Sequence, residues 1–564
     1  MSVTKPVARE SRNVLSLGEL LRVRAVELRD RPYLTVNGRG YTFGELDARS
    51  DAVAAALHLH CVQAGDRVAL LAPNRPEVVE LFFGLAKLGA IQVPLNAALK
   101  GEFLRYQLNQ SQASVIVIDG EGAGTFAAVA DELPDLRLCV LLDNDQDGAE
   151  LAGIARIGYE EFARATSASP AVSVNPADTM TIMYTSGTTG FPKGCLLSHG
   201  YYQRAARAVA RGVEATEHDV LFTTLPMFHA AAMFSTVIGG LVQATPAVID
   251  PAFSARNFLA RAAEVKATIA FAVGAMGNAL LATPASPADR AHRLRAMVVA
   301  PLPPQAQQAF RERFGIEPHA QLYGQTECMP ITCTPLSSVR DPAGCGDPAE
   351  DLELGLLDDE DRAVGSREVG EIVIRPKGRF VTFDGYWNQP EATLEAFRDL
   401  WYHTGDYGRL LPSGQLEFID RRKDALRRRG ENISSMQLET AIHAHPKVVD
   451  VAVHAVASAL TEDDVKACIV LTEGVIITPE ELFAFFCEQL PSYAIPRYVE
   501  FLDELPRTAV GRIMKYKLRE RPIDERVWDF EQLGLRPNRF ERGGAASRQA
   551  ENPEHRSHGT TNDG

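Results

Sequence analysis

Short apolar runs alternate with longer segments of helical hydrophobic spacing over roughly the first half of the chain. The run DRVALL at 66–71 is followed by a turn at Pro73-Asn74, a helical segment, and a second apolar run at 91–94. This order is typical of a βαβ unit with parallel strands. Further apolar runs lie at 114–119, 136–142, 247–250, 267–273 and 295–300. The pattern predicts an α/β fold with parallel-rich sheets covered by helices.

Turn and capping residues mark the ends of several expected elements. The pair Asn37-Gly38 indicates a hairpin turn, and the segment from Thr42 to Glu45 is a capping box that starts a helix. Near the other end of the chain, the segment from Thr478 to Glu481 has an N-cap threonine, a proline and a glutamate. These residues predict a second capping box at the start of a helix.

The pattern changes after residue 365, where short strands alternate with glycine-rich turns, so we expect a β-rich subdomain there. A charged run at 420–430 precedes a compact α+β segment. We therefore expect a large N-terminal domain over 1–421 and a small C-terminal domain over 422–540. The last residues, 541–564, have few apolar side chains to bury and are predicted to form a disordered tail.

Composition narrows the class of protein. The chain has 564 residues, which exceeds the ~250–300 that one hydrophobic core supports. A net charge of −15 argues against a nucleic-acid partner, which requires a concentrated basic surface. The eight cysteines are scattered without a C-x-x-C pair, and no apolar stretch has the length of a signal peptide or a membrane span. We expect a cytoplasmic protein with no integral membrane segment.

Residues 184–194, YTSGTTGFPKG, carry the strongest chemical signal in the chain. Consecutive glycine, serine and threonine residues allow several backbone N–H groups to converge on one anion, and a lysine adds a point charge. The spacing differs from a Walker A loop, since Lys193 lies three residues after Gly190 and is followed by glycine. Apolar residues flank the segment on both sides, which favours a phosphate-binding loop between strands over a flexible linker.

Residues 184–194 resemble the phosphate-loop signature of the adenylate-forming superfamily, which includes acyl-CoA synthetases, luciferases and the adenylation domains of peptide synthetases. Further motifs appear in the order of that family. They are LPMFH at 225–229, YGQTE at 323–327, GYWNQPEAT at 385–393, WYHTGD at 401–406, DRRKD at 420–424 and LPRTAVGRIMKYKLR at 505–519. The resemblance extends from about residue 16 to about 520 and is nearest to the carnitine/crotonobetaine-CoA ligase-like branch.

The resemblance implies an ATP site assembled from several motifs. The implied phosphate contacts are Thr185, Ser186, Gly187, Thr188, Thr189, Gly190 and Lys193. Tyr323 and Gly324 would bind the adenine, Thr326 would donate to the α-phosphate, and Glu327 together with Thr185 would hold Mg²⁺. Asp406 and Arg421 would bind the ribose hydroxyls.

The family uses a small C-terminal domain that rotates between two half-reactions. By resemblance, Lys423 is the hinge residue, and Gly430 lies where the pantetheine arm of coenzyme A passes. Arg512 stands at the position of the family's adenylation lysine, and Lys515 is the next lysine that could serve. Arg427, Arg428 and Arg429 are either plain surface residues or contacts for the phosphates of coenzyme A.

The implied acyl pocket contains Phe228, His229, Met233, Val273, Gly274 and Ala275. Small residues in the segment FAVGAMG would leave room for the acid, and no acidic or basic residue there could fix the charges of an amino acid. These features disfavour an amino-acid-activating domain. A departure from the family is Val298-Val299, which replaces the usual glycine pair before the adenine contact.

The leading interpretation is an acyl-CoA ligase that uses ATP, Mg²⁺ and coenzyme A to activate a small-molecule carboxylic acid. One alternative is an acyl-AMP ligase that loads a carrier protein or an amine. A second alternative, motivated by Arg512, is a non-catalytic binder of nucleotide or acyl-adenylate. The sequence leaves the identity of the acid and the formation of a homodimer open.

Overall fold

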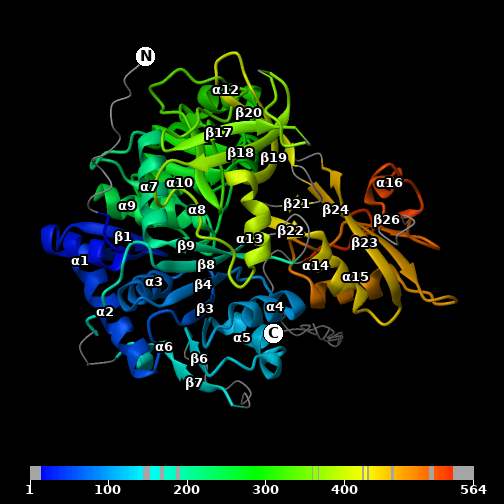
Figure 1. Ribbon diagram of the computed structural model, residues 1–564, viewed down its shortest axis with the longest axis horizontal. Helices are drawn as coiled ribbons and strands as arrows, with labels where there is room; N and C mark the ends of the chain where they lie inside the picture. The colour runs from blue at the N-terminus through cyan, green and yellow to red at the C-terminus, as the bar shows by residue number, and fades with distance from the viewer. Residues whose placement is uncertain are drawn as a thin grey trace, which may run out of the picture.

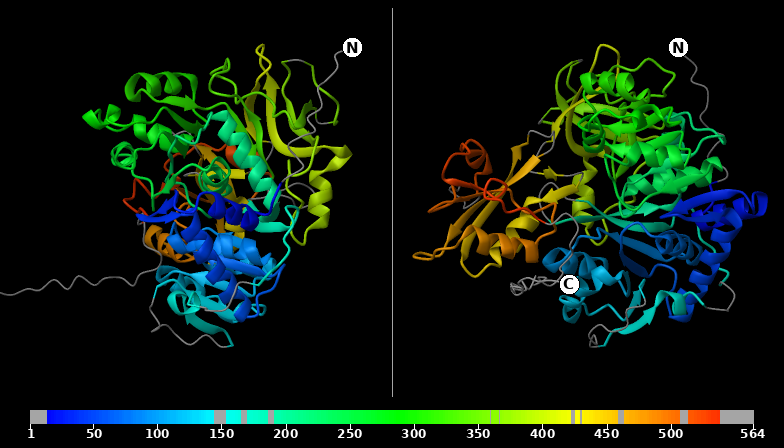
Figure 2. Two further views of the ribbon diagram at one scale, coloured as in Figure 1. Left: turned by 90° about the vertical axis from the view of Figure 1, so that its left-hand side faces the viewer. Right: turned by 180° about the vertical axis from the view of Figure 1, so that it is seen from behind.

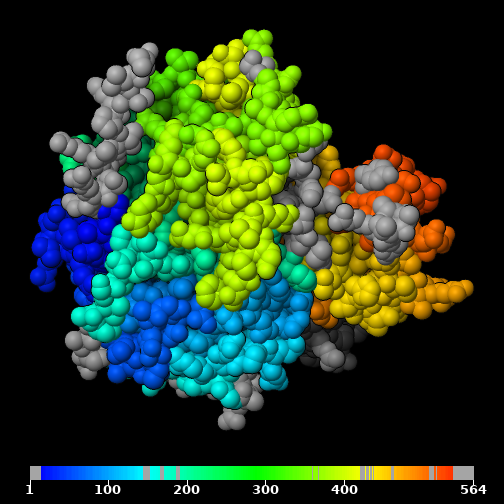
Figure 3. Space-filling view, viewed as in Figure 1, coloured from blue at the N-terminus to red at the C-terminus, as the bar shows by residue number. Residues whose placement is uncertain are grey.

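The computed structural model describes residues 14–143, 153–164, 170–185, 191–358, 360–365, 367–421, 425–428, 431–458, 463–506 and 513–537. A large N-terminal part carries two seven-stranded sheets and a four-stranded sheet, and a small C-terminal part projects from its side (Figures 1 and 2). The space-filling view shows the small part in orange and red beside the large one (Figure 3). The predicted α/β class with parallel-rich sheets, a β-rich subdomain and a small α+β domain is confirmed.

The first seven-stranded sheet has the order β7-β6-β5-β3-β4-β8-β9. All neighbours are parallel except the last pair, which is antiparallel. Its strands are β3 (Arg67–Leu71), β4 (Ile91–Leu95), β5 (Val115–Ile118), β6 (Leu138–Leu141), β7 (Ala155–Gly158), β8 (Thr179–Thr185) and β9 (Lys193–Ser198). The predicted phosphate loop therefore connects two neighbouring strands at the edge of a sheet.

The second seven-stranded sheet has the order β14-β13-β12-β10-β11-β1-β2 and is parallel except for the hairpin β1–β2. Its strands are β1 (Pro32–Val36), β2 (Arg39–Thr42), β10 (Leu221–Thr223), β11 (Ala247–Ile249), β12 (Ile269–Val273), β13 (Ala296–Ala300) and β14 (Glu317–His319). The hairpin turn predicted at Asn37-Gly38 is confirmed, because both residues have positive φ angles of 49° and 84°.

Helices cover both of these sheets. They are α1 (Leu17–Glu27), α2 (Phe43–Leu59), α3 (Pro76–Leu88), α4 (Gly101–Ser111), α5 (Gly120–Ala127), α6 (Tyr159–Phe162), α7 (His199–Gly212), α8 (Ala230–Ala232), α9 (Ile238–Gln243), α10 (Phe258–Glu264), α11 (Gly274–Leu281) and α12 (Pro304–Phe314). The predicted capping box from Thr42 to Glu45 is confirmed, with both reciprocal hydrogen bonds present. Among the described residues, no helix combines the length and the apolar character needed to cross a membrane.

The β-rich subdomain comprises a two-stranded and a four-stranded antiparallel sheet. Its elements are β15 (Leu322–Gln325), β16 (Cys328–Cys333), β17 (Leu352–Leu357), β18 (Gly370–Pro376), α13 (Pro390–Ala396), β19 (Tyr402–Leu410) and β20 (Leu416–Arg421). Two of the family-like motifs, at 323–327 and 401–406, lie on β15 and β19 or directly beside the ends of these strands. The subdomain therefore carries much of the expected nucleotide site.

The small C-terminal part is an α+β unit around a four-stranded sheet, β23-β24-β25-β26. Its elements are β21 (Ala425–Arg428), β22 (Glu431–Ser434), α14 (Ser435–His443), β23 (Val448–Ala457), β24 (Asp463–Leu471), α15 (Pro479–Gln489), β25 (Tyr498–Phe501), α16 (Lys515–Arg519) and β26 (Val527–Asp529). Its buried apolar side chains form one cluster with side chains of β3, β4 and α4, so the two parts pack against each other.

The second predicted capping box is only half formed. The hydroxyl of Thr478 accepts from the backbone N–H of Glu481, as expected. The carboxylate of Glu481 pairs with Lys447 at 2.5 Å instead, because an ammonium is a stronger partner than a backbone N–H. The predicted domain boundary at 422 and the predicted tail at 541–564 lie outside the described residues and stay predictions.

Candidate active site

The two strands that flank the predicted phosphate loop bring its end residues together. Thr185 ends β8, Lys193 begins β9, and the two residues face each other in the antiparallel register. The residues between them that were predicted to contact phosphate, Ser186, Gly187, Thr188, Thr189 and Gly190, lie outside the described residues. On the far side, the ring of Tyr106 in α4 stacks on Phe191 at a centroid distance of 4.6 Å. Its hydroxyl also donates to the carbonyl of Pro192, so α4 holds the end of this segment.

Glu327 lies directly beside this pair, although it is more than 130 residues away in the sequence. Its carboxylate Oε1 accepts hydrogen bonds from the hydroxyls of Thr185 at 3.1 Å and Tyr386 at 3.0 Å. The side chain is buried. The ammonium of Lys193 lies 5.0 Å from the centre of the Tyr386 ring, which is cation–π distance. Three of the predicted site residues are therefore neighbours.

Tyr386 is a residue of this site to which the sequence motifs gave no role. It lies within the motif at 385–393, so its position in a family-like segment was the available signal. Burial raises its pKa, and the nearby charge of Glu327 raises the pKa further. The phenol therefore stays protonated and donates to the carboxylate.

The residues around Glu327 fit the predicted magnesium ion. A buried carboxylate next to the hydroxyl of Thr185 offers hard oxygen ligands, which Mg²⁺ prefers, and Mg²⁺ proteins commonly supply one or two carboxylates beside substrate phosphates. Lys193, at the start of the neighbouring strand β9, supplies positive charge. This set of donors suits a metal that is shared between the protein and a polyphosphate.

The expected ribose site surrounds Asp406 on β19. Oδ2 of its buried carboxylate accepts from the hydroxyl of Tyr323 at 2.7 Å and from the amide of Gln325 at 2.7 Å. Burial raises the pKa of Tyr323, and the charge of Asp406 adds to this effect. Arg421 on β20 pairs with Asp406 in the strand register. Gln325, within the motif at 323–327, is a second contact that the sequence did not single out.

The turn between β15 and β16 is tightly packed. A Cβ atom at Gly324 would lie 2.5 Å from the sulfur of Met329 and 2.8 Å from the carbonyl oxygen of Cys328, so only glycine fits. The carbonyl of Thr326 accepts from the hydroxyl of Tyr201 at 2.8 Å. These contacts fix the backbone that carries Tyr323 and Glu327 into the site.

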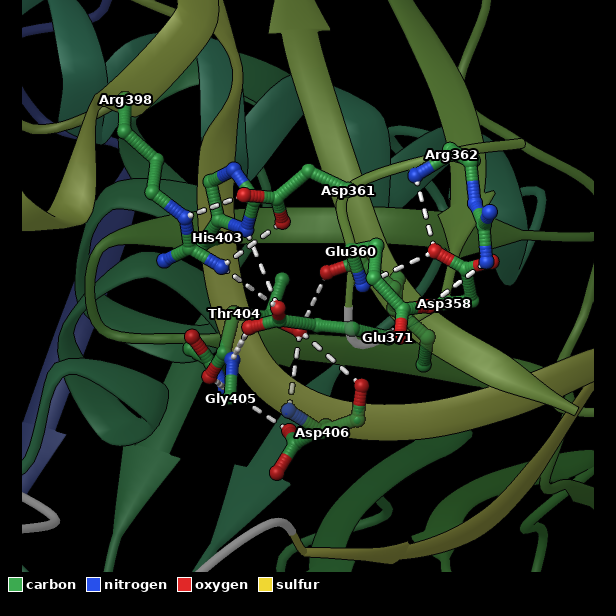
Figure 4. A network of polar contacts seen from close by, with 12 residues as sticks. Asp358, Glu360, Asp361, Arg362, Glu371, Arg398, His403, Thr404, Gly405 and Asp406 are labelled. Carbon is green, nitrogen blue, oxygen red and sulfur yellow. Dashed lines mark hydrogen bonds and ion pairs between the residues drawn. The ribbon is translucent and has the colours of Figure 1, made fainter. Parts of the chain in front are cut away.

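A polar network stands directly behind Asp406 (Figure 4). The carboxylate of Glu371 lies 3.0 Å from Nδ1 of His403 and accepts from the N–H of Gly405 at 3.1 Å. Asp361, Glu371 and His403 have ligand atoms close enough to hold a metal ion. However, the guanidinium of Arg398 donates to Asp361 and to Glu371 at 3.1 Å each, so it supplies the positive charge between the two carboxylates. The cluster is therefore an ion-pair network.

A cavity of about 70 Å³ lies between the large and the small part of the molecule. Thr185, Phe228 and His229 line it from the large part, and Glu431 and Tyr493 line it from the small part. Nε2 of His229 lies 3.0 Å from Oε1 of Glu431, which joins the two parts across the cavity. Two residues predicted for the acyl pocket are thus placed beside the predicted phosphate loop.

The other residues predicted for the acyl pocket do not line this cavity. Met233 is buried in the core of the large part, which agrees with plain packing. Val273 ends β12, and Gly274 and Ala275 begin α11. The expected room at Gly274 is absent, because a Cβ atom there would lie 1.9 Å from the carbonyl oxygen of Pro301.

Residues of the small part fall into two groups. Lys423, Gly430 and Arg512 lie outside the described residues, so the hinge, pantetheine and adenylation assignments stay predictions. Lys515 is described, and its ammonium contacts the hydroxyl of Ser435 and the carboxylate of Glu439, each at 2.7 Å. This lysine is therefore held inside the small part, not beside Thr185 and Glu327.

Both suggestions for Arg428, a plain surface residue or a contact for the phosphates of coenzyme A, are wrong. Its side chain is buried and donates to the carbonyl of Ile495, and its guanidinium lies 3.3 Å from the carboxylate of Asp464. An arginine that is buried and paired in this way is part of the interior of the small part and has little surface left for a ligand.

Comparisons with known proteins agree with this geometry. The family model described as AMP-binding enzyme matches residues 21–387, and the model described as AMP-binding enzyme C-terminal domain matches residues 437–512. Crotonobetaine/carnitine–CoA ligase from Salmonella paratyphi B is 32% identical over 487 residues, which cover 85% of this chain and 93% of the relative. The corresponding ligase from Citrobacter koseri is 32% identical over 493 residues, with the same shares covered.

Two solved structures of one enzyme share the fold of this chain over most of its length. A double mutant of o-succinylbenzoate CoA synthetase from Bacillus subtilis, bound with a product analogue, superposes with a TM-score of 0.77 at 26% identity, covering 89% of this chain and 98% of that one. The same enzyme in complex with AMP superposes with a TM-score of only 0.63 at 27% identity, over 90% and 98%. By this measure the chain superposes better on the complex with the product analogue than on the complex with AMP.

The resemblance inferred from the sequence motifs is confirmed by these matches. The family models cover both the large and the small part, and the matched relatives extend over most of the chain. The chain belongs to the AMP-binding enzyme family.

Proposed function

We propose that the protein is an ATP-dependent acyl-CoA ligase that forms an acyl-adenylate and passes the acyl group to coenzyme A. The observation that carries the proposal is the convergence of Thr185, Glu327 and Lys193 at one end of a sheet. This arrangement unites a phosphate loop with a carboxylate able to hold a metal. Asp406 on the neighbouring subdomain supplies the acceptor that a ribose requires.

The first half-reaction joins two anions, so it depends on charge neutralisation and positioning. A carboxylate oxygen of the acid attacks the α-phosphorus of ATP, the bond from that phosphorus to the pyrophosphate oxygen breaks, and pyrophosphate leaves. Lys193 and the hydroxyl of Thr185 hold phosphate oxygens in this proposal, and Asp406 accepts from the ribose hydroxyls. Magnesium bound by Glu327 and Thr185 would neutralise phosphate charge during this step.

The second half-reaction transfers the acyl group to a thiol. The thiol of coenzyme A loses its proton, its sulfur forms a bond to the acyl carbon, and AMP leaves. The cavity beside Thr185 and His229 supports this step, because a narrow space between the two parts suits an extended pantetheine arm. Glu431 and Tyr493 would line the path from the small part.

The class of carboxylic acid is proposed from the residue types of the predicted acyl pocket and from the names of the relatives. The described residues predicted for the acyl pocket are apolar or neutral, apart from His229, which supports a small carboxylic acid without a free α-amino group. The relatives named crotonobetaine/carnitine–CoA ligase make acids with a quaternary ammonium group the first to test. The cytoplasmic location, the homodimer and the domain boundary at 422 are predictions that cell fractionation, light scattering and limited proteolysis would check.

The test is a panel of carboxylic acids supplied to the purified protein with ATP and Mg²⁺. We expect release of pyrophosphate with a suitable acid, and equal amounts of AMP and acyl-CoA once coenzyme A is added. Formation of ADP and phosphate would contradict the proposal. Acyl transfer to an amine or a carrier protein but not to coenzyme A would favour the acyl-AMP ligase, and binding of ATP without any product would favour the non-catalytic binder.

A further inference from the structure

We propose that Glu371 is a positioning residue for nucleotide binding, which acts by fixing the turn that presents Asp406 to the ribose of ATP. The proposal rests on the proposed function, because it takes Asp406 as the ribose acceptor. Glu371 lies on β18, and its side chain is only 3% exposed. In this proposal it acts through the backbone of the neighbouring strand, where it accepts from the N–H of Gly405.

The contacts of Glu371 fall on two residues of the turn that are separated by Thr404. Its Oε1 accepts from the N–H of Gly405 at 3.1 Å, and its Oε2 lies 3.0 Å from Nδ1 of His403. Gly405 has a φ of 70°, the left-handed region in which a residue with a side chain would be strained. Asp406 follows directly, so the carboxylate of Glu371 sets the direction in which β19 carries Asp406 (Figure 4).

The strand register shows why this support is needed. On β18, Glu371 pairs with Tyr407 and Val373 pairs with His403, so the single residue Ile372 faces the three residues 404–406 of β19. Regular ladder bonds from β18 therefore do not hold Asp406. Such bulges often re-aim a side chain next to a functional site.

The backbone of Ile372, next to Glu371, makes a second contact with this turn. The hydroxyl of Thr404 donates to the carbonyl of Ile372 at 2.6 Å and accepts from the N–H of Asp406 at 3.1 Å. Glu371 and Ile372 of β18 thus together hold residues 403–405 of β19. The hydroxyl bond is neutral, whereas the bonds to Glu371 involve a carboxylate and are the stronger ones.

Arg398 makes the buried charge of Glu371 tolerable. A buried carboxylate without a cation would be strongly unfavourable, and the guanidinium of Arg398 donates to Glu371 at 3.1 Å. Arg398 is held in turn by Asp361 at 3.1 Å, whose side chain is 34% exposed. The network therefore runs from the surface to the turn, and a change at its outer end should also reach Asp406.

The experiment measures binding of ATP and of 2′,3′-dideoxy-ATP by calorimetry, together with the KM for ATP in pyrophosphate release. Glu371→Gln keeps the shape and removes the charge. Because hydrogen bonds to charged groups are stronger than neutral ones, we expect the Kd and the KM for ATP to rise about tenfold or more. The Kd for 2′,3′-dideoxy-ATP should change less than about twofold, since that nucleotide has no ribose hydroxyl for Asp406. Equal losses for both nucleotides, or none for ATP, would overturn the proposal.

Two further variants complete the test. Asp358→Asn is the matched control, because this carboxylate lies in the same region and accepts from Arg362 and from the N–H of Glu360, which lie outside the turn at 403–406. It should leave both Kd values unchanged. In the background of Asp406→Asn, Glu371→Gln should add less than about twofold to the Kd for ATP, as two residues acting through one contact are not additive. An independent additional loss would mean that Glu371 does not act through Asp406.

Failure of folding and failure of the proposed function give different results. If Glu371→Gln does not fold, Asp361→Asn removes only the outer carboxylate, and an unchanged Kd for ATP in that variant would overturn the proposal. If the protein binds ATP more tightly than 2′,3′-dideoxy-ATP but releases no pyrophosphate with any acid, the proposed function is wrong. The role of Glu371 in binding ATP is then unaffected. If the two nucleotides bind the unchanged protein equally, the assignment of Asp406 falls, and the proposal with it.

Discussion

Glu327 shows how a single side chain can join the parts of this site. It accepts hydrogen bonds from Thr185 on one sheet and from Tyr386 beside the subdomain, and both bonds end on the same oxygen. Since a buried carboxylate is costly without partners, this position is specific for an acceptor that can also bind a metal. The residue type, the burial and the neighbours of Glu327 all favour the same role.

Glu327→Gln should lower the rate of pyrophosphate release about 10²- to 10³-fold, because loss of one group that stabilises developing charge costs ~2.7–4 kcal/mol. The amide keeps the shape and can still accept from Thr185 and Tyr386, so the melting temperature should change little. Stopped-time assays at several Mg²⁺ concentrations check the prediction. An unchanged rate at saturating Mg²⁺ would remove Glu327 from the site.

We expect substitutions of Arg512 and Lys515 to have different effects on the first half-reaction. Lys515 is held by Ser435 and Glu439, so we expect Lys515→Ala to leave pyrophosphate release within about twofold while lowering stability, as loss of a partly buried ion pair does. Arg512→Ala should depress pyrophosphate release and spare thiol capture of a supplied acyl-adenylate. Arg512→Lys should preserve or raise the rate, because a compact ammonium fits between two oxyanions more easily than a planar guanidinium. Loss of release only in Lys515→Ala would reverse the assignment.

At the scale of elements, the junction of β12 and α11 has less open space than its small residues suggest. Gly274 packs against the backbone of Pro301, and a Cβ atom at Gly277 would lie 2.5 Å from Cγ2 of Val299. These glycines allow α11 to approach β13 and the segment after it closely. Small residues in a sequence therefore indicate either an open pocket or a close contact between elements. Here they allow the close contact of α11 with β13 and the segment after it.

Gly274→Ala should lower the melting temperature, since overpacking against a backbone atom costs ~1–3 kcal/mol. Gly124→Ala in α5 is the matched control, because a Cβ atom there meets nothing within 4 Å. That change should leave stability equal or slightly higher, as alanine favours a helix over glycine. Differential scanning fluorimetry of the two variants decides the matter. Equal melting temperatures would show that the backbone near Pro301 can yield.

At the scale of the whole molecule, two polar contacts between described residues help to join the small part to the large part, in addition to the apolar cluster that the parts share. One is the pair of His229 and Glu431 across the cavity. The other is Lys100, whose ammonium donates to the carbonyl of Cys487 near the end of α15, where a helix favours a cation. Burial lowers the pKa of Lys100, which agrees with its position between the two parts.

Lys100→Met should slow thiol capture of a supplied acyl-adenylate about tenfold, because it removes one charge-assisted bond that favours this docking of the small part. Pyrophosphate release should stay within about twofold, since Lys100 touches none of the residues around Glu327. Lys377→Met is a suitable control, as Lys377 is exposed and donates to a carbonyl within the large part. Equal slowing of both half-reactions by Lys100→Met would count against a role in docking.

Features that depend on neighbouring residues were determined by the sequence alone. The hairpin at Asn37-Gly38, the capping box that starts at Thr42 and the apolar runs of β3 to β6 were predicted, because backbone preference and hydrophobic period act over a few residues. The pairing of Thr185 with Lys193 is also local, since one hairpin joins β8 to β9. The motifs and their order identified the family, because the motifs contain the residues of the site themselves.

Only the tertiary structure decided which distant side chains meet. Tyr386 at Glu327, Glu371 behind the turn of Asp406 and Glu431 at His229 are contacts between segments that are far apart in the chain. The space at Gly274 and the burial of Arg428 were likewise set by the packing of other elements. A single sequence carries residue types and local periods, whereas these contacts follow from sheet order, strand register and the docking of the small part, which arise only when the whole chain has folded.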